Sequence, residues 1–162
     1  MLLPEFTAWL SQTHISQYAS SQDWIIVVSQ SIHIVAVAVV IAPMLMLNLR
    51  MLGIPATNQP IATFANRFVP PVWIAFLVLL FTGIVQTIAE PGRELLSNTF
   101  WLKMCMVAIV VVITLIVHRT TKSDATYWES RPGLSKAVAS FSIVLWIAIL
   151  VAGRFIAYLE HG

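Results

Sequence analysis

Four apolar stretches, each long enough to cross a lipid bilayer, constrain this chain more than any other feature of its sequence. A membrane span needs about 20 mainly apolar residues, because the hydrocarbon core is about 30 Å thick and a helix rises about 1.5 Å per residue. Backbone polar groups in lipid must be satisfied internally, and four segments are too few for a closed barrel. The stretches therefore predict helices, over residues 24–49, 69–89, 100–118 and 137–158.

The composition agrees with a chain surrounded by lipid. Of the 162 residues, 59% are hydrophobic and 10% are charged, which is too little charge for the surface of a water-soluble domain. The net charge of +2 and the lack of a basic run argue against nucleic-acid binding. Cys105 is the only cysteine, so no intrachain disulfide can form. We predict an all-α fold, a single membrane domain over residues 1–162 that forms an antiparallel four-helix bundle.

The N-terminal segment has a different pattern. Residues 4–20 place Phe6, Trp9 and other apolar residues among polar neighbours, which predicts a short amphipathic helix at the membrane interface. The first 21 residues contain no Lys or Arg and include Glu5, unlike a cleaved signal peptide. We therefore expect the chain to enter the membrane through its first span.

The positions of Lys and Arg predict the orientation. The connections over residues 50–68 and 119–136 together carry six Lys or Arg, whereas the loop on the other side carries only Arg93. Basic residues collect in cytoplasmic loops. The sequence thus predicts a multi-pass protein of a bacterial inner membrane, with both connections cytoplasmic and both termini outside, in the periplasm.

A few polar side chains interrupt the predicted spans. An ionisable group inside a membrane helix costs about 2.5–3.5 kcal/mol on insertion scales, so each one needs an explanation. His33 is the deepest, about 14 Å below the outer end of the first span. The polar residues expected in the outer half of the bundle are His33, Gln30, Gln86, Lys103, Arg154 and Tyr158. Together they predict a polar pocket that opens outward, with an imidazole at its floor and donors for a bound anion above it.

Simpler explanations compete with this interpretation. Lys103 and Arg154 are close enough to the interface to extend their charged ends into it. Gln30 and Gln86 can form hydrogen bonds between helices, and a lone buried His33 can do the same. The methionines are more typical of packing than of a copper site, because no His-rich or Met-x-x-Met cluster accompanies them.

A second, weaker polar cluster is expected at the cytoplasmic ends of the spans, formed by Asn48, Arg50, His118 and Arg119. His118 lies near a helix C-terminus, where the helix dipole favours a cation. It is about 13 Å from the depth of His33, too far for both to ligate one iron. At the depth of His33 the other helices are expected to present only apolar side chains: Leu79, Leu80, Ile109, Val110, Leu150 and Val151. A haem on His33 would then be five-coordinate or would recruit Lys103.

Three segments carry a family resemblance: SQSIHIVAVAVVIAPMLMLNLRMLG, FWLKMCMVAIVVVITLIVHR and VAGRFIAY. They resemble a family of bacterial four-helix inner-membrane proteins to which no function is assigned. A more distant likeness is to the HemJ-type membrane protoporphyrinogen oxidases and the CopD-like copper resistance domains. His33, Arg50, Lys103 and His118 match positions of the HemJ-type pattern, mainly over the first three spans. The resemblance implies that His33 ligates haem b and that Lys103 contacts the porphyrin. The C-terminal helix lacks the acidic and asparagine pattern of that family, and the metal cluster of the CopD-like domains is also missing.

The leading hypothesis is a membrane redox protein that binds a porphyrin, haem b, in the outer half of the bundle. His33 would be the metal ligand, and Lys103, Arg154 and Tyr158 would bind the propionates. The electron partner would be quinone in the bilayer or a larger membrane complex. The alternative is a non-enzymatic accessory or assembly subunit of such a complex. A transporter or channel ranks last, because no span carries an acidic residue at mid-depth.

Overall fold

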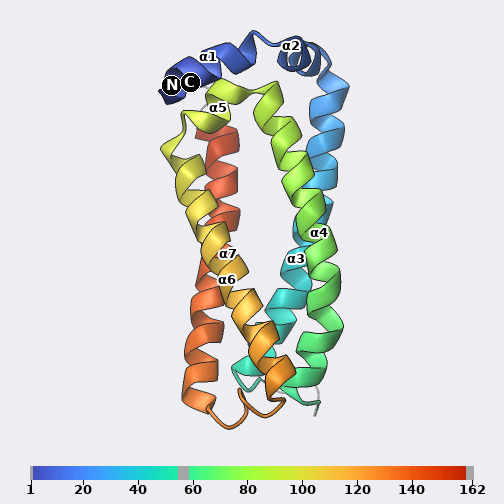
Figure 1. Ribbon diagram of the computed structural model, residues 1–162, viewed down its shortest axis with the longest axis vertical. Coiled ribbons are helices and arrows are strands. Elements are labelled where there is room, and N and C mark those ends of the chain that lie inside the picture. The colour runs from blue at the N-terminus through green and yellow to red at the C-terminus, as the bar shows by residue number, and fades with distance from the viewer. Residues whose placement is uncertain (1, 55–58, 160–162) are drawn as a thin grey trace.

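The computed structural model describes residues 2–54 and 59–159, with side chains as far as Ile156 in the last helix. Four long helices run in alternating directions (Figure 1): α3 (Asp23–Met51), α4 (Ile61–Ala89), α6 (Asn98–Ser123) and α7 (Pro132–Leu159). Helix α3 packs against α4 and α7, and α6 packs against the same two helices. The described part of the chain contains helices and no strand. The prediction of an all-α antiparallel four-helix bundle is therefore confirmed.

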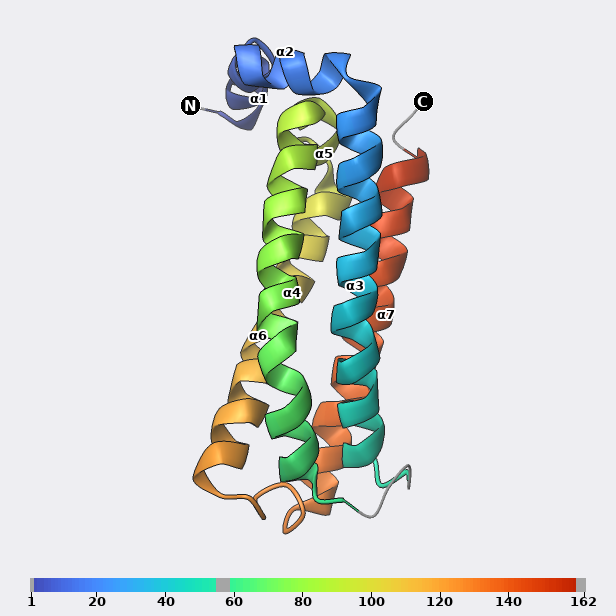
Figure 2. The same cartoon turned by 90° about the vertical axis from the view of Figure 1, so that its right-hand side faces the viewer.

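Three short helices close one end of the bundle, which we call the capped end: α1 (Leu3–Ser11), α2 (His14–Ser21) and α5 (Pro91–Leu95). Figure 2 shows α1 and α2 lying across the tops of the long helices. The Ser16 hydroxyl donates to the backbone carbonyl of Ile88 at 2.7 Å, which ties α2 to the end of α4. The predicted N-terminal helix is present, but it is divided into two, since Thr13 caps a new helix by accepting from the Ser16 amide.

The long helices extend beyond the predicted spans at the end opposite the cap. Helix α4 begins directly after Pro60 and continues through Pro70 and Pro71, whereas the predicted span began at residue 69. Helix α6 begins after Ser97, whose side chain accepts from the amide of Phe100 at 3.1 Å, and it continues to Ser123. The predicted spans were bounded by their apolar content, but a helix continues into polar sequence for as long as its backbone hydrogen bonds form.

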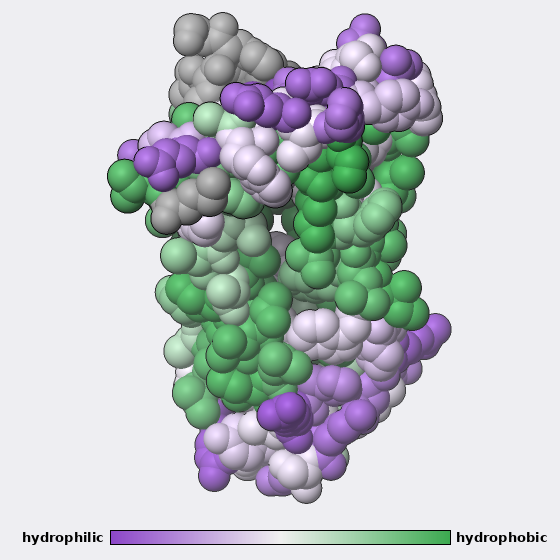
Figure 3. All heavy atoms as spheres, turned by 45° about the horizontal axis from the view of Figure 1, so that its top comes forward, coloured by the Kyte–Doolittle hydropathy of each residue, from purple (hydrophilic) through white to green (hydrophobic). Residues whose placement is uncertain are grey.

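The outer faces of the long helices are apolar. In the most apolar window of each, only 17% to 28% of the residues are buried inside the protein. Figure 3 shows an apolar middle zone with polar residues at both ends. Exposed apolar surface on this scale requires a lipid environment. The protein is therefore a multi-pass membrane protein with four spanning helices.

Packing inside the bundle is uneven along its length. The fully buried residues Val40, Val69, Val72 and Val110 all belong to one hydrophobic cluster. With Met51, Phe64 and Trp128, this cluster extends to the end opposite the cap. Toward the capped end the buried positions include the polar residues Ser29, Thr82 and Glu94, and Figure 3 shows the surface hollowed there, between the helices and below the polar cap.

Candidate functional site

His33 points from α3 toward α4. It lies on the inner face of α3, one turn from Ser29 and one turn from Ala36, which are both buried. The imidazole is half-buried, and its Nδ1 is 2.7 Å from the hydroxyl oxygen of Thr82 on α4. Ten residues separate His33 from the start of α3, which places it about 15 Å below the capped end of that helix. The expected deep imidazole therefore faces a neighbouring helix rather than lipid.

The part of α4 around Thr82 holds the imidazole in place. Thr82 is 4% exposed, and its hydroxyl donates to the carbonyl of Val78 at 2.8 Å. Ser29 adds a second link between the helices by donating to the carbonyl of Thr82 at 3.2 Å. The next residue is Gly83, where an added Cβ would be 3.9 Å from Cε1 of His33. A side chain at residue 83 would therefore be in van der Waals contact with the imidazole.

Sequence reasoning missed Thr82, because it placed Leu79 and Leu80 at the depth of His33. That estimate assumed that α3 and α4 end at the same height. In the structure α3 extends about one turn further than α4 at the capped end, where it joins α2. A signal for the site was present in the sequence, since Thr82 and Gln86 are polar residues four apart on one face of an apolar span.

Lys103 lies on α6, close enough to His33 to act on it electrostatically. It is half-buried near the start of α6, with its ammonium 5.4 Å from the ring centre of Phe100. It is also close enough to act electrostatically on Glu94. Glu94 is 7% exposed in α5, and its carboxylate is 3.6 Å from the guanidinium of Arg93. The structure thus places His33, Lys103 and Glu94 within electrostatic range along one side of the capped half.

The two glutamines also lie in the capped half. Gln86 is one turn beyond Thr82 on α4, and its Nε2 is buried without a hydrogen-bond partner among the described residues. Buried polar groups are nearly always paired, so this donor is available to an acceptor from outside the described residues. Gln30 is half-buried on α3, one turn before His33.

Two candidate residues, Arg154 and Tyr158, belong to α7. Arg154 lies near the capped end of α7 with an exposed side chain. Tyr158 follows it by one turn on the same helix, and its side chain lies outside the described residues. Both are thus at the same end of the bundle as Lys103.

In the second polar cluster, at the end opposite the cap, Asn48 and Arg50 form hydrogen bonds within the protein. Asn48 is buried and donates to the hydroxyl of Ser142 on α7 at 3.0 Å. Arg50 donates through Nε to the carbonyl of Gln59 at 2.7 Å. His118 is half-buried, and its Nε2 is buried without a partner in the described part of the chain. Arg119 is exposed.

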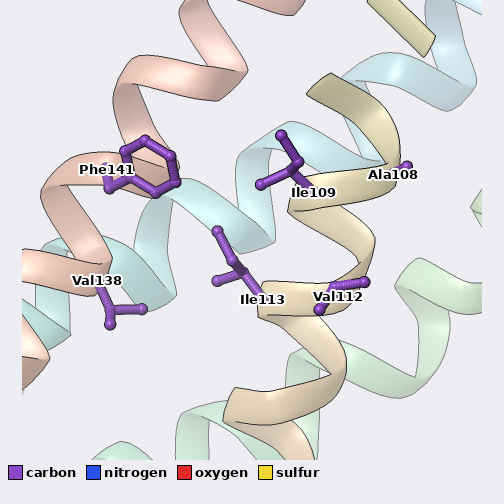
Figure 4. A pocket seen from close by; sticks show the side chains of 6 residues that line it. All are labelled: Ala108, Ile109, Val112, Ile113, Val138 and Phe141. Carbon is purple, nitrogen blue, oxygen red and sulfur yellow. The ribbon is translucent and has the colours of Figure 1, made fainter. Parts of the chain in front are cut away.

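Two apolar grooves lie on the surface of the bundle, and His33 lines neither of them. One has a volume of about 390 Å³ and lies between α6 and α7 (Figure 4). The other, of about 580 Å³, follows the seam between α3 and α4. The first is lined only by apolar side chains, and Ser31 is the one polar residue of the second. Neither has groups that carry out chemistry, so the polar residues around His33 form the best candidate site.

The fold and this site define a class: a multi-pass helical membrane protein with one histidine-centred polar site in the capped half of its bundle. Residues 6–159 match a family of unknown function, DUF6644. The match covers almost the entire chain, and the chain belongs to that family. A comparison with curated proteins and another with solved structures gave no match.

Proposed function

We propose that this protein is a membrane redox protein that binds haem b in the capped half of the bundle, with His33 as the iron ligand. The observation that supports this most directly is the half-buried imidazole of His33, which is held by Thr82 between α3 and α4. An ionisable side chain at such a depth is costly, and function is the usual reason for keeping it.

The donor set fits a porphyrin better than a bare metal ion. Zinc and copper sites typically take three or four protein ligands. Within the described ranges, no three His, Cys, Asp or Glu side chains lie close enough to hold an ion. Haem needs only one or two protein ligands, since the porphyrin supplies the other four, and a single proximal His is a common arrangement. His33 alone is sufficient for that role.

The surrounding side chains suit the carboxylate edge of such a cofactor. Lys103 supplies a cation near the capped end, and the buried Nε2 of Gln86 is a donor without a partner in the described chain. In this proposal Lys103, Arg154 and Tyr158 bind the propionates, while Gln86 and Gln30 lie along the cofactor's polar side. When bound, haem would supply one-electron transfer. The protein's own residues would orient it and exclude water from its apolar face.

The proposal includes an orientation and a class of partner. In this proposal the end opposite the cap lies in the cytoplasm of a bacterial inner membrane, and the six basic residues of its two connections support that orientation. The capped end then faces the periplasm. Electrons would be exchanged with quinone in the bilayer or with a neighbouring subunit. Reporter fusions in the connection after Ser123 and at the C-terminus test this orientation, because only a cytoplasmic fusion of green fluorescent protein fluoresces.

Absorption spectroscopy tests the proposed function. The protein is purified in mild detergent from haem-replete cells, and its oxidised and dithionite-reduced spectra are recorded. We expect a Soret band, a pyridine haemochrome in near-unit ratio, and loss of both in His33→Ala. The matched control is His118→Ala, which removes the other described half-buried histidine of the long helices. A colourless wild-type preparation, or equal loss in both variants, would refute the proposal.

A second function is favoured by the two membrane-facing grooves. Their volumes of about 390 and 580 Å³ and their apolar lining suit contact with helices of another subunit. In that case the protein would be a non-enzymatic accessory or assembly subunit, and the bonds of His33 would serve only to join α3 to α4. Co-purification of a stoichiometric partner with a haem-free protein would favour this alternative.

A further inference from the structure

The proton on His33 can be located from its hydrogen bonds. Nδ1 of His33 is 2.7 Å from the hydroxyl oxygen of Thr82, and that hydroxyl oxygen is 2.8 Å from the carbonyl oxygen of Val78. A hydroxyl has a single proton to donate but can accept through two lone pairs. A carbonyl oxygen can only accept, so the Thr82 proton must point toward Val78 if both bonds are to form.

Only one tautomer of a neutral imidazole satisfies this arrangement. If Nδ1 carries the proton, it donates to the Thr82 hydroxyl, which donates in turn to Val78, and both bonds form. If Nε2 carries the proton, Nδ1 must accept from Thr82 and the bond to Val78 is lost. One hydrogen bond changes a population by roughly 2- to 12-fold. The chain from His33 through Thr82 to Val78 therefore favours the proton on Nδ1.

We infer that Thr82 is a positioning residue that holds His33 in the Nδ1–H tautomer and so presents the lone pair of Nε2 to a ligand. This inference rests on the proposed function for the identity of that ligand, haem iron. In other metal-ligating histidines, a carboxylate or carbonyl partner fixes the tautomer and the ring orientation. The hydrogen bond to Thr82 has the same effect on His33. Nε2 has no hydrogen-bond partner among the described residues, so it remains free to coordinate.

The neighbouring contacts support this geometry. Ser29 bonds to the carbonyl of Thr82 itself, which fixes the level of α3 against α4. Gly83 lets the imidazole edge lie against α4 without a side chain between them. Thr82 is 4% exposed, so water does not readily compete for its hydroxyl. These contacts fix the depth of the His33 ring in the bundle, the ring edge that faces α4 and the ring nitrogen that donates to Thr82.

Two substitutions and a matched control test the inference. Thr82→Val keeps the shape but removes the hydroxyl, and Thr82→Ser restores it. Thr87→Val is the control, because Thr87 is on the same helix and its hydroxyl donates to the carbonyl four residues earlier at 2.9 Å, with no bond to His33. By analogy with other outer-shell ligand partners, we expect Thr82→Val to weaken haem binding by about 10- to 100-fold. Thr82→Ser and Thr87→Val should bind as the wild type does.

Nitrogen NMR on haem-free protein separates the inference from the proposed function. The protein is labelled with ¹⁵N-histidine, and His33→Gln identifies the signals of His33 among those of the four histidines. We expect a protonated Nδ1 and an unprotonated Nε2 in the wild type and in Thr82→Ser, and a shift toward the other tautomer in Thr82→Val. A protein that never binds haem but shows this pattern would refute only the proposed function. Haem binding that is equal in Thr82→Val and Thr87→Val, or a protonated Nε2 in the wild type, would overturn the inference.

Discussion

The bond between Asn48 and Ser142 offers a quantitative test of how α3 and α7 are joined. The side-chain nitrogen of Asn48 donates to the Ser142 hydroxyl at 3.0 Å, and the two residues are 6% and 4% exposed. Hydrogen bonds between membrane helices average about 0.6 kcal/mol and reach about 1.7 kcal/mol. Because this bond is short and both partners are buried, we expect a coupling free energy in the upper part of that range, about 1 to 1.7 kcal/mol.

The single substitutions should each cost more than the coupling. Ser142→Ala leaves the amide of Asn48 buried without its partner, which costs about 1–3 kcal/mol. Asn48→Ala removes the amide and leaves a small cavity in its place, for a cost of about 2–3 kcal/mol. The double variant should be less destabilised than the sum of the two, since the second substitution removes a bond that the first has already broken.

Unfolding in mixed micelles with increasing dodecyl sulfate, followed by far-ultraviolet circular dichroism, measures these free energies. Ser140→Ala is the control, because Ser140 is exposed on the same helix and its removal should cost less than about 0.5 kcal/mol. A coupling free energy indistinguishable from zero would refute the reasoning. The same conclusion would follow if Ser142→Ala were no more costly than Ser140→Ala.

Three further predictions concern the ends of the bundle and the site. Glu129 accepts from the first amide of α4 at 3.1 Å, so Glu129→Ala should destabilise the protein by about 1 kcal/mol in the same micelle titration. An unchanged midpoint would show that this cap contributes nothing. Gly83→Leu should lower haem content without loss of helicity, because even a Cβ at Gly83 would be 3.9 Å from His33; a full pyridine haemochrome in this variant would contradict the site. The hydrogen bonds from Thr126 hold the pKa of Asp124 below its ordinary value. This stabilisation is present above the unfolded-state pKa and is lost as pH falls through the folded-state pKa. Thr126→Ala should therefore raise the pKa of Asp124 in a carboxyl ¹³C titration, and an unchanged midpoint would exclude the bond.

The architecture could be predicted from the sequence because it depends on hydropathy averaged over whole membrane spans. Each spanning helix is so apolar on average that a few polar residues or prolines do not change the prediction of a membrane span. The N-terminal amphipathic pattern was also readable. The break at Thr13 and the single turn of α5 were not predicted.

The candidate site could be predicted only in part. The depth of His33 follows from the rise per residue, but its partner depends on the relative height of two helices. An offset of about one turn between α3 and α4 replaced the expected Leu79 and Leu80 with Thr82. No pattern within either helix encodes that offset. It is a property of the tertiary packing, in which α2 contacts both α3 and α4 at the capped end.

The concentration of buried valines far from the cap also determines how the molecule moves. Amides near Val72 and Val110 should exchange with water only when the entire bundle unfolds, whereas those around His33 should exchange through smaller openings. Local opening around His33 would then leave the contacts among the buried valines in place, so the four helices would stay joined at the other end.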